Sequence, residues 1–430
     1  DRSPSRGLGD VYKRQFHGRE FVDDYEWLRD KESPETLAYL EAENAYTKQQ
    51  TAHLDGLTDA IYNEIKSRVK ETDMSVPQRQ GDWWYYGRTE EGKSYGISCR
   101  VPVADGSDPW VPPTLPEDGS GLPGEQVLLD FNVLAKGHEF FSVGASSVST
   151  SGRYLAFSTD IRGDERFDLK VKDLETEQLL DDEIPGVFYG ATWAGEDHIF
   201  YIRVDDAWRP HQVWRHKLGT DAADDVLVYE ETDEKFGVGV AADRSERYVL
   251  IVSASSLTTE YRVLPMDDPE GDFEVLWPRE PGVEYNVDVA VLEQDGKEEE
   301  RWVVTHNAHG PNSSVGVCAA GAELPPLREL TELMPHSDEV RIEGTDSYRD
   351  FIFAAYRRGG IGRLAVADLT GGEFGAFREL EFDEELYTAG LAGNPEWDAP
   401  VVRISYTSFT QPAQVLDYRV ATGELTLLKE

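Results

Sequence analysis

The chain has 430 residues, and its 83 acidic and 42 basic side chains give a formal net charge of −41 at pH 7. Such a surface repels the phosphate groups of nucleic acids and of anionic membranes, so we expect neither as a partner. It favours cationic partners, although the same charge can serve solubility alone. The sequence contains no run of 18 apolar residues, so it predicts no membrane-spanning segment.

The cysteine content indicates a reducing environment. Cys99 and Cys318 are the only cysteines, which is too few for a disulfide framework, and no signal segment opens the chain. We therefore expect a cytoplasmic protein. Hydrophobic residues make up 39% of the chain and aromatic residues 11%, which is enough for a large core and favours strands over helices.

The first fifteen residues, DRSPSRGLGDVYKRQ, differ from the rest of the sequence. They are basic in a strongly acidic chain, and they show neither helical nor strand periodicity. We interpret residues 1–15 as a non-native leader, or else as a disordered tail, and leave them out of the fold prediction.

Residues 16–76 are predicted to form a short helical segment. Ser33 is a suitable N-cap because its hydroxyl can accept a hydrogen bond from a free backbone N–H, and Pro34 follows where a missing N–H costs nothing. A second helix is predicted from about Thr58 to Glu71. Its apolar residues recur every four positions and form one stripe, Ile61, Ile65 and Val69.

Residues 77–430 contain short runs of Val, Ile, Tyr and Trp separated by Gly, Asp, Asn and Pro, as expected for antiparallel strands and hairpins. Seven units of about 45 to 55 residues follow one another. One unit contains RYLAFSTD and RFDLKVKDL, and the next contains HIFYIRVD and QVWRHKLGT. Four strands per unit at this period predict a seven-bladed β-propeller. Two consecutive β-sandwiches are the alternative fold.

No catalytic constellation is recognisable in the sequence. A nucleophile elbow requires Gly-x-Ser-x-Gly, which is absent, and the nearest string, GASSVSTSG from Gly144, lies in a strand-and-turn repeat. His211 and His216 are five apart on a predicted strand, so they lie on opposite faces. His306 and His309 fall in a predicted loop without an obvious third metal ligand. CxxC and phosphate-binding glycine motifs are also absent, so we expect no catalytic residue, no metal and no cofactor in this chain.

Several strings, in the same order along the chain, carry a family resemblance. HGREFVDDYEWLRD (His17 to Asp30) and YLEAENAYT (Tyr39 to Thr47) resemble the N-terminal helical segment of the prolyl oligopeptidase family, the S9 serine peptidases. RPHQVWRHKLGT (Arg209 to Thr220) and the later YTSFTQPAQVLDYRVATGE resemble its oligopeptidase B-like members in particular. The resemblance runs from about Phe16 to Glu430.

In that family the propeller caps an α/β-hydrolase domain that follows it and carries the catalytic Ser, Asp and His. No residue here matches that triad, so the resemblance implies an N-terminal segment and propeller without the α/β-hydrolase domain. It implies an intact enzyme that cleaves short peptides after Arg or Lys, and the acidic chain favours cationic ones; cleavage after proline is the less favoured alternative. The resemblance assigns substrate contacts to no particular residue. The helical stripe, with Trp27 and Leu28, would pack on the missing domain and be exposed without it.

Two other interpretations remain open. A non-catalytic acidic propeller that binds cationic peptides agrees with the absent nucleophile, because a fold does not determine a function. A propeller enzyme with its own site in the central channel would need clustered His or carboxylate side chains on the inner strands, and the sequence shows none. Under the peptidase interpretation we expect the 430-residue chain to be inactive on Arg and Lys esters and amides.

Overall fold

The computed structural model describes residues 12–106, 108–321 and 323–430, and it divides the chain into two compact units, residues 1–70 and 71–430. Most of the predicted leader, residues 1–11, lies outside the described residues. Residues 12–15 differ from our expectation, because β1 (Tyr12–Phe16) pairs with β2 (Arg19–Asp23) in an antiparallel hairpin. His17 and Gly18 form its two-residue turn with φ values of 50° and 76°, the left-handed conformation that such turns require.

Two helices follow the hairpin in the first unit. Helix α1 (Pro34–Thr51) begins as predicted, with the Ser33 hydroxyl accepting a hydrogen bond from the Glu35 N–H at 3.3 Å. Helix α2 (Asp55–Ser67) begins and ends slightly earlier than predicted. The predicted apolar stripe is exposed, as expected, although Val69 lies beyond the end of α2: Ile61 is 49% exposed, Ile65 61% and Val69 59%. Trp27 is only half-buried and packs edge-on against Tyr39 of α1.

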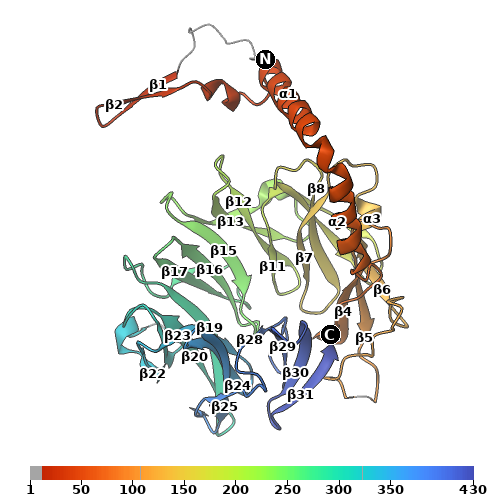
Figure 1. Ribbon diagram of the computed structural model, residues 1–430. Coiled ribbons are helices and arrows are strands. Elements are labelled where there is room, and N and C mark those ends of the chain that lie inside the picture. Colours follow the sequence, from red (N-terminus) through yellow and green to blue (C-terminus); the bar gives the residue numbers. More distant parts are fainter. Residues whose placement is uncertain (1–11, 107, 322) are drawn as a thin grey trace. The chain divides into compact units, whose positions relative to one another are not determined.

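The described part of the second unit is a ring of seven antiparallel sheets, which confirms the predicted seven-bladed β-propeller (Figure 1). The sheets are numbered here in chain order. Sheets one to three are β3 (Gln78–Gln80), β4 (Trp83–Arg88), β5 (Ile97–Pro102) and β6 (Gln126–Asp130); β7 (Ser142–Val148), β8 (Tyr154–Asp160), β9 (Phe167–Asp173) and β10 (Leu179–Val187); and β11 (Ala191–Ala194), β12 (His198–Val204), β13 (Pro210–Lys217) and β14 (Val226–Glu230). The short helix α3 (Phe131–Leu134) lies between sheets one and two.

The remaining four sheets repeat this arrangement. They are β15 (Gly237–Ala242), β16 (Tyr248–Ala254), β17 (Thr259–Pro265) and β18 (Glu274–Val275); β19 (Tyr285–Gln294), β20 (Lys297–His306), β21 (Ser314–Ala319) and β22 (Thr331–Met334); β23 (Val340–Ser347), β24 (Phe351–Arg358), β25 (Ile361–Thr370), β26 (Glu373–Phe374) and β27 (Arg378–Glu379); and β28 (Tyr387–Leu391), β29 (Val401–Ser408), β30 (Gln414–Arg419) and β31 (Glu424–Lys429). In sheet six both β26 and β27 pair with β25.

This topology gives the ring two ends. In every sheet the strands lie side by side in chain order and run antiparallel. The turns that join strands two and three, and the connections between sheets, therefore lie at one end, which we call the connection end. The turns that join strands one and two, and strands three and four, lie at the opposite end. The chain enters β3 from Pro77 and leaves β31 at Glu430, and both points lie at the connection end.

The core lies between neighbouring sheets. Buried and half-buried residues alternate along β9, as expected for a strand with one face against a neighbour. Leu169 and Val171 of that strand pack with Ile199 and Tyr201 of sheet three. Full burial of one such aliphatic side chain contributes about 1.5–3 kcal/mol to stability. Around the middle of the ring the first strands contact one another, β11 with both β7 and β15, and β19 with β23.

The ring closes between sheets seven and one without a shared strand, because in the described residues the strands of each pair only within their own sheet. Side chains make the closure instead. Buried Arg403 binds Asp417 of its own sheet at 2.9 Å and the Pro77 carbonyl oxygen at 2.6 Å. Lys429 Nζ lies 2.6 Å from both Asp73 Oδ2 and the Met74 carbonyl oxygen. The first and last parts of the ring are thus joined by charged hydrogen bonds.

Candidate functional site

The serines of GASSVSTSG lie on β7 and its turn to β8, and a carboxylate holds two of them. Ser149 Oγ and Ser151 Oγ donate to Glu196 Oε2 at 3.0 and 2.6 Å. A nucleophilic serine instead needs a base that can take its proton, usually a histidine. Ser149 and Ser151 therefore join sheets two and three and have no catalytic geometry.

One serine does lie beside two histidines. Ser314 Oγ lies 3.4 Å from His306 Nε2 and 3.4 Å from His309 Nδ1, and His309 Nδ1 lies 3.1 Å from Glu332 Oε1. A catalytic triad requires the serine and the carboxylate to bind different ring nitrogens. Here both bind the same nitrogen of His309, and Ser314 is fully buried. Burial lowers the pKa of His306 to about 4, which keeps its ring neutral. The cluster is a structural contact.

His211 and His216 both lie on β13, as the predicted strand implied. His216 is fully buried between two carboxylates, with Nδ1 2.6 Å from Asp225 Oδ1 and Nε2 2.9 Å from Asp182 Oδ1. Tyr201 donates to the other oxygen of Asp225 at 2.8 Å. These bonds tie sheets two and three together. Within the described ranges, no group of three His, Cys, Asp or Glu side chains is arranged to hold a metal ion.

The two ends of the ring differ in their exposed apolar side chains. Among the described residues, eight exposed large apolar side chains lie on turns and connections of the connection end, and one lies on a turn of the opposite end. The eight are Val133, Phe140, Ile161, Tyr189, Trp208, Leu257, Leu386 and Phe409, and the one is Val111. Since contiguous exposed apolar surface marks interaction sites, the connection end is the candidate functional site.

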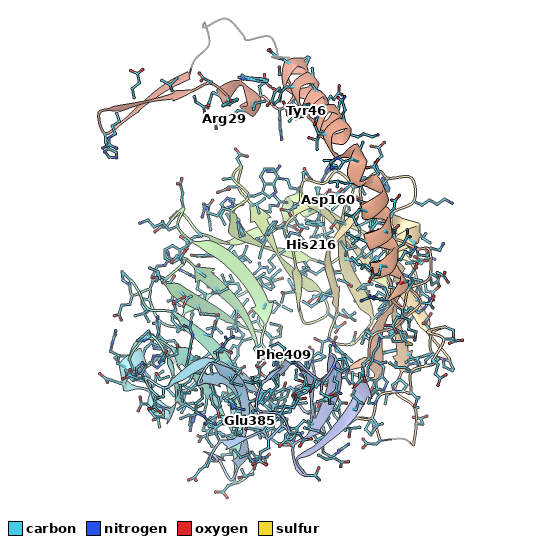
Figure 2. All side chains as sticks on the ribbon, in the orientation of Figure 1. Arg29, Tyr46, Asp160, His216, Glu385 and Phe409 are labelled. Carbon is cyan, nitrogen blue, oxygen red and sulfur yellow. The ribbon has the colours of Figure 1, made fainter. Side chains whose placement is uncertain are left out.

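The turn between β8 and β9 organises one part of this site. Asp160 is buried, and its carboxylate accepts hydrogen bonds from the N–H groups of Arg162, Gly163 and Glu165 at 2.7, 3.0 and 2.9 Å. Burial opposes ionisation, but these backbone bonds outweigh it and lower the pKa of Asp160. Figure 2 labels Asp160. The turn is therefore rigid without any help from a ligand.

That turn holds two aromatic side chains in place. Tyr189, between β10 and β11, donates its hydroxyl to Glu165 Oε1 at 3.2 Å. Trp208, between β12 and β13, donates from Nε1 to the Asp164 carbonyl oxygen at 2.9 Å, and the Arg166 guanidinium stacks 4.4 Å from its ring centroid. Sheets two and three together present fixed aromatic surface edged by carboxylates. Such a surface can bind the apolar and cationic parts of a peptide.

A second part of the site lies at sheets six and seven. Phe409, on the turn between β29 and β30, is 95% exposed. The hydroxyl groups of Ser408 and Thr410 on either side of it each donate to Glu384 Oε1 at 2.8 Å, so the turn is tied to the connection that precedes β28. Glu385 follows on that connection, and Figure 2 labels it together with Phe409. Ser408, Phe409 and Thr410 lie in the string YTSFTQPAQVLDYRVATGE that carried the family resemblance, but the sequence assigned none of them a role. An aromatic residue inside a polar turn string was a usable signal.

Comparison with known proteins identifies the family. Residues 9–430 match the family described as prolyl oligopeptidase, N-terminal beta-propeller domain. The chain belongs to this family. It is 35% identical to dipeptidyl aminopeptidase BI of Pseudoxanthomonas mexicana, over 96% of this chain and 56% of that protein. It is 29% identical to protease 2 of Moraxella lacunata, over 97% of this chain and 57% of that protein.

Solved structures show the same relationship. Oligopeptidase B from Trypanosoma brucei superposes with a TM-score of 0.83 at 31% identity, over 96% of this chain and 56% of that one. Oligopeptidase B from Leishmania major gives a TM-score of 0.84 at 26% identity, over 99% and 60%. The predicted resemblance to oligopeptidase B-like members of the family is therefore confirmed. The chain spans little more than half the length of these proteins. None of the helices described here is long and apolar enough to cross a membrane.

Proposed function

We propose that this chain is the N-terminal segment and propeller of an oligopeptidase B-like serine peptidase, and that its connection end faces an α/β-hydrolase domain. The observation that carries this proposal is the one-sided distribution of exposed apolar side chains on turns and connections, eight at the connection end against one at the other among the described residues. The chain also enters and leaves the ring at that end, so a domain joined after Glu430 starts beside this surface.

In such an enzyme the chemistry belongs to the hydrolase domain. A serine hydroxyl oxygen attacks the peptide carbonyl carbon while a histidine takes the hydroxyl proton and then gives it to the leaving amine. Water hydrolyses the resulting acyl-enzyme and regenerates the serine. The role of the propeller is to cover the site, so that short peptides reach it and folded proteins do not.

We further propose that the substrates are short cationic peptides cleaved after Arg or Lys in the cytoplasm. Carboxylates at the connection end support this specificity, since a negatively charged mouth raises the local concentration of cations. Among the described residues, Asp383 and Glu385 beside Phe409 form no ion pair with a basic side chain. The relatives carry several names, including prolyl endopeptidase for a 22% identical protein, so cleavage after proline is the outcome to exclude.

The proposal is tested with a fusion protein, in which Glu430 of this chain is joined to the C-terminal part of the Pseudoxanthomonas relative that this chain does not cover. We expect the joined protein to hydrolyse Arg and Lys amides faster than Pro amides, and peptides faster than folded proteins. The 430-residue chain alone is expected to be inactive. Turnover by the chain alone that a serine-directed inhibitor blocks, or equal rates on peptides and folded proteins, would contradict the proposal.

A non-catalytic acidic propeller that binds cationic peptides is the second candidate. The carboxylates of Asp383 and Glu385, which form no ion pair with a described basic side chain, favour it. It predicts that the chain alone binds Arg-rich peptides at the connection end and that the joined protein gains no activity.

A further inference from the structure

A groove of about 730 Å³ lies between sheets four and five. It is lined by β17, β18 and the turn between them, by residues 276–278 after β18, by the start of β16, by Trp302 of β20 and by the segment that follows β21. None of the exposed apolar side chains or carboxylates named in the candidate site lines it. The groove is therefore separate from that site, and what it binds does not depend on the proposed peptidase function.

The floor of the groove is apolar and fixed. Trp277 and Trp302 form part of it, together with Val263, Leu276 and Leu324. Trp277 donates from Nε1 to the Pro325 carbonyl oxygen at 2.8 Å, and its own carbonyl oxygen accepts a bond from Tyr285 at 2.7 Å. Because both ends of this residue are held, the groove keeps its shape without an occupant. Pockets of about 300–1,000 Å³ with aromatic and aliphatic walls are the usual form of a ligand site.

The rim of the groove is acidic, and its negative charges are not paired with basic side chains. Asp268, Asp272 and Glu274 line it and are exposed, and no described basic residue forms an ion pair with any of them. The basic side chains near this turn bind groups on its other side. Arg215 donates to the Pro269 carbonyl oxygen at 2.8 Å, and Lys217 pairs with Glu270 at 2.9 Å. An occupant must therefore supply its own positive charge.

The strand beside the groove also has a free edge. Strand β18 pairs with β17 through Arg262–Val275 and Val263–Glu274, and it is the last strand of its sheet. Its outer backbone groups can therefore accept an extended chain. Val275 on this strand is 42% exposed and lines the groove.

We propose that this groove binds a short extended peptide segment in which an aliphatic side chain is flanked by Arg or Lys. The aliphatic side chain fills the space over Trp277, Trp302 and Leu324, and the flanking cations pair with the carboxylates of the rim. An acidic segment is excluded by charge, and a wholly polar basic segment lacks the apolar anchor that the floor requires.

The first test fills the groove with a large side chain. Gly321 lines it, and no atom lies within 4 Å of the position that a Cβ would take, so Gly321→Trp fills the groove without a clash. The probe is a fluorescently labelled, end-blocked peptide of alternating Arg and Leu, followed by polarisation. We expect Gly321→Trp to weaken binding at least tenfold. The matched control is Gly56→Trp on α2, where the Cβ position is also free, and it should bind like the wild type.

The second test removes the charge of the rim. The triple variant Asp268→Asn, Asp272→Asn, Glu274→Gln is expected to weaken binding about tenfold. Its control is Glu177→Gln, Asp295→Asn, Glu424→Gln, which removes three exposed carboxylates outside both the groove and the connection end and should have little effect. Peptides of alternating Glu and Leu, and of alternating Arg and Ser, should bind weakly to the wild type.

Two outcomes would overturn the proposal. Wild-type affinity in Gly321→Trp places binding outside the groove. An equal loss in both triple variants shows that the probe responds only to the net charge of −41. The melting temperature of each variant verifies that it is folded, and both outcomes are independent of any peptidase activity.

Discussion

The two ends of the propeller differ in the contacts that their surface side chains make. At the opposite end, charged side chains reach across the ring. Arg244, on the turn between β15 and β16, binds Asp346 at 2.5 Å and the carbonyl oxygens of Ser347 and Asn394 at 3.1 and 3.0 Å. One guanidinium of sheet four thus contacts sheets six and seven. Its plane also lies 4.4 Å from the centre of the Tyr348 ring.

Other turns at that end are joined in the same way. Glu196 of sheet three binds Ser149 and Ser151 of sheet two, and the Glu396 carboxylate of sheet seven accepts the Gly81 N–H of sheet one. The connection end also has contacts between sheets, such as Trp208 with Asp164 and Lys429 with Asp73, but it carries most of the exposed apolar side chains on turns. The ends therefore differ in exposed apolar surface, which is concentrated where we propose that a partner domain binds.

Removal of Arg244 gives the largest expected effect and tests the bracing directly. Arg244→Met leaves one carboxylate and two carbonyl oxygens without their donor, so we expect the free energy of unfolding to fall by about 3 kcal/mol, measured by urea unfolding. Hydrogen exchange should also become faster at residues 344–350 and 392–397, in sheets six and seven.

The matched control is Arg153→Met, on the equivalent turn of sheet two. Arg153 pairs with Asp173 at 3.0 Å within its own sheet and is half exposed, so its loss should cost much less. Equal costs for the two variants would show that the contacts across the ring add nothing.

The next largest effect is on the free energy of unfolding at low pH, and it comes from His306, the buried histidine at the connection end. The folded pKa of His306 is about 4, below its unfolded value of 6.5, so between these values the unfolded chain binds the proton and the folded chain does not. His306 therefore costs stability as pH falls from 6.5 towards 4. At pH 5 this cost is about 2 kcal/mol.

The test for this group compares His306→Gln with the wild type by urea unfolding at pH 7 and pH 5. The variant lacks the titrating ring, so its stability relative to the wild type should rise by about 2 kcal/mol on going to pH 5. A stability difference that is the same at both pH values would contradict the buried, neutral state of His306.

The turn that carries the aromatic part of the candidate site gives a smaller effect. Asp160→Asn keeps one acceptor oxygen but replaces the oxygen that accepts from the Glu165 N–H at 2.9 Å. We expect a loss of about 1 kcal/mol and faster hydrogen exchange in residues 161–166. Unchanged exchange there would mean that Asp160 does not set the conformation of the turn.

The sequence predicted the repeats but not the first strand of each sheet, which lies nearest the middle of the ring. The strings quoted for two of the units correspond to the second and third strands of sheets two and three, which are rich in branched aliphatic and aromatic residues. Some first strands are built mainly of small residues, as in GVGVAA of β15 and ATWA of β11, although β19 (YNVDVAVLEQ) is not. Close packing requires this: a Cβ on Gly144 of β7 would lie 2.6 Å from the Phe167 ring. Strands selected for tight contact lose the apolar pattern by which sequence analysis finds them.

The candidate site was beyond sequence analysis for a different reason. Its residues come from turns as distant as Phe140 and Phe409, and only the ring topology puts them at one end. The same holds for the bracing, since Arg244 and Asn394 are 150 residues apart in the chain. By contrast, the Ser33 cap of α1 is local, and it was predicted correctly because its donor lies two residues away.

The smallest effect on the chain itself comes from its most exposed aromatic side chain. Phe409→Asp at the connection end and Leu179→Asp at the opposite end each replace an exposed side chain, so both should change the free energy of unfolding by less than about 0.5 kcal/mol. In the fusion protein with the hydrolase part of the Pseudoxanthomonas relative, the two variants should differ in peptidase activity. Loss of one apolar contact at an interface costs about 1 kcal/mol, so Phe409→Asp should lower kcat/KM on an Arg amide about fivefold, while Leu179→Asp leaves it unchanged. If both variants retain full activity, Phe409 is not at the domain interface; if both lose it equally, the two ends do not have the separate roles inferred from their surfaces.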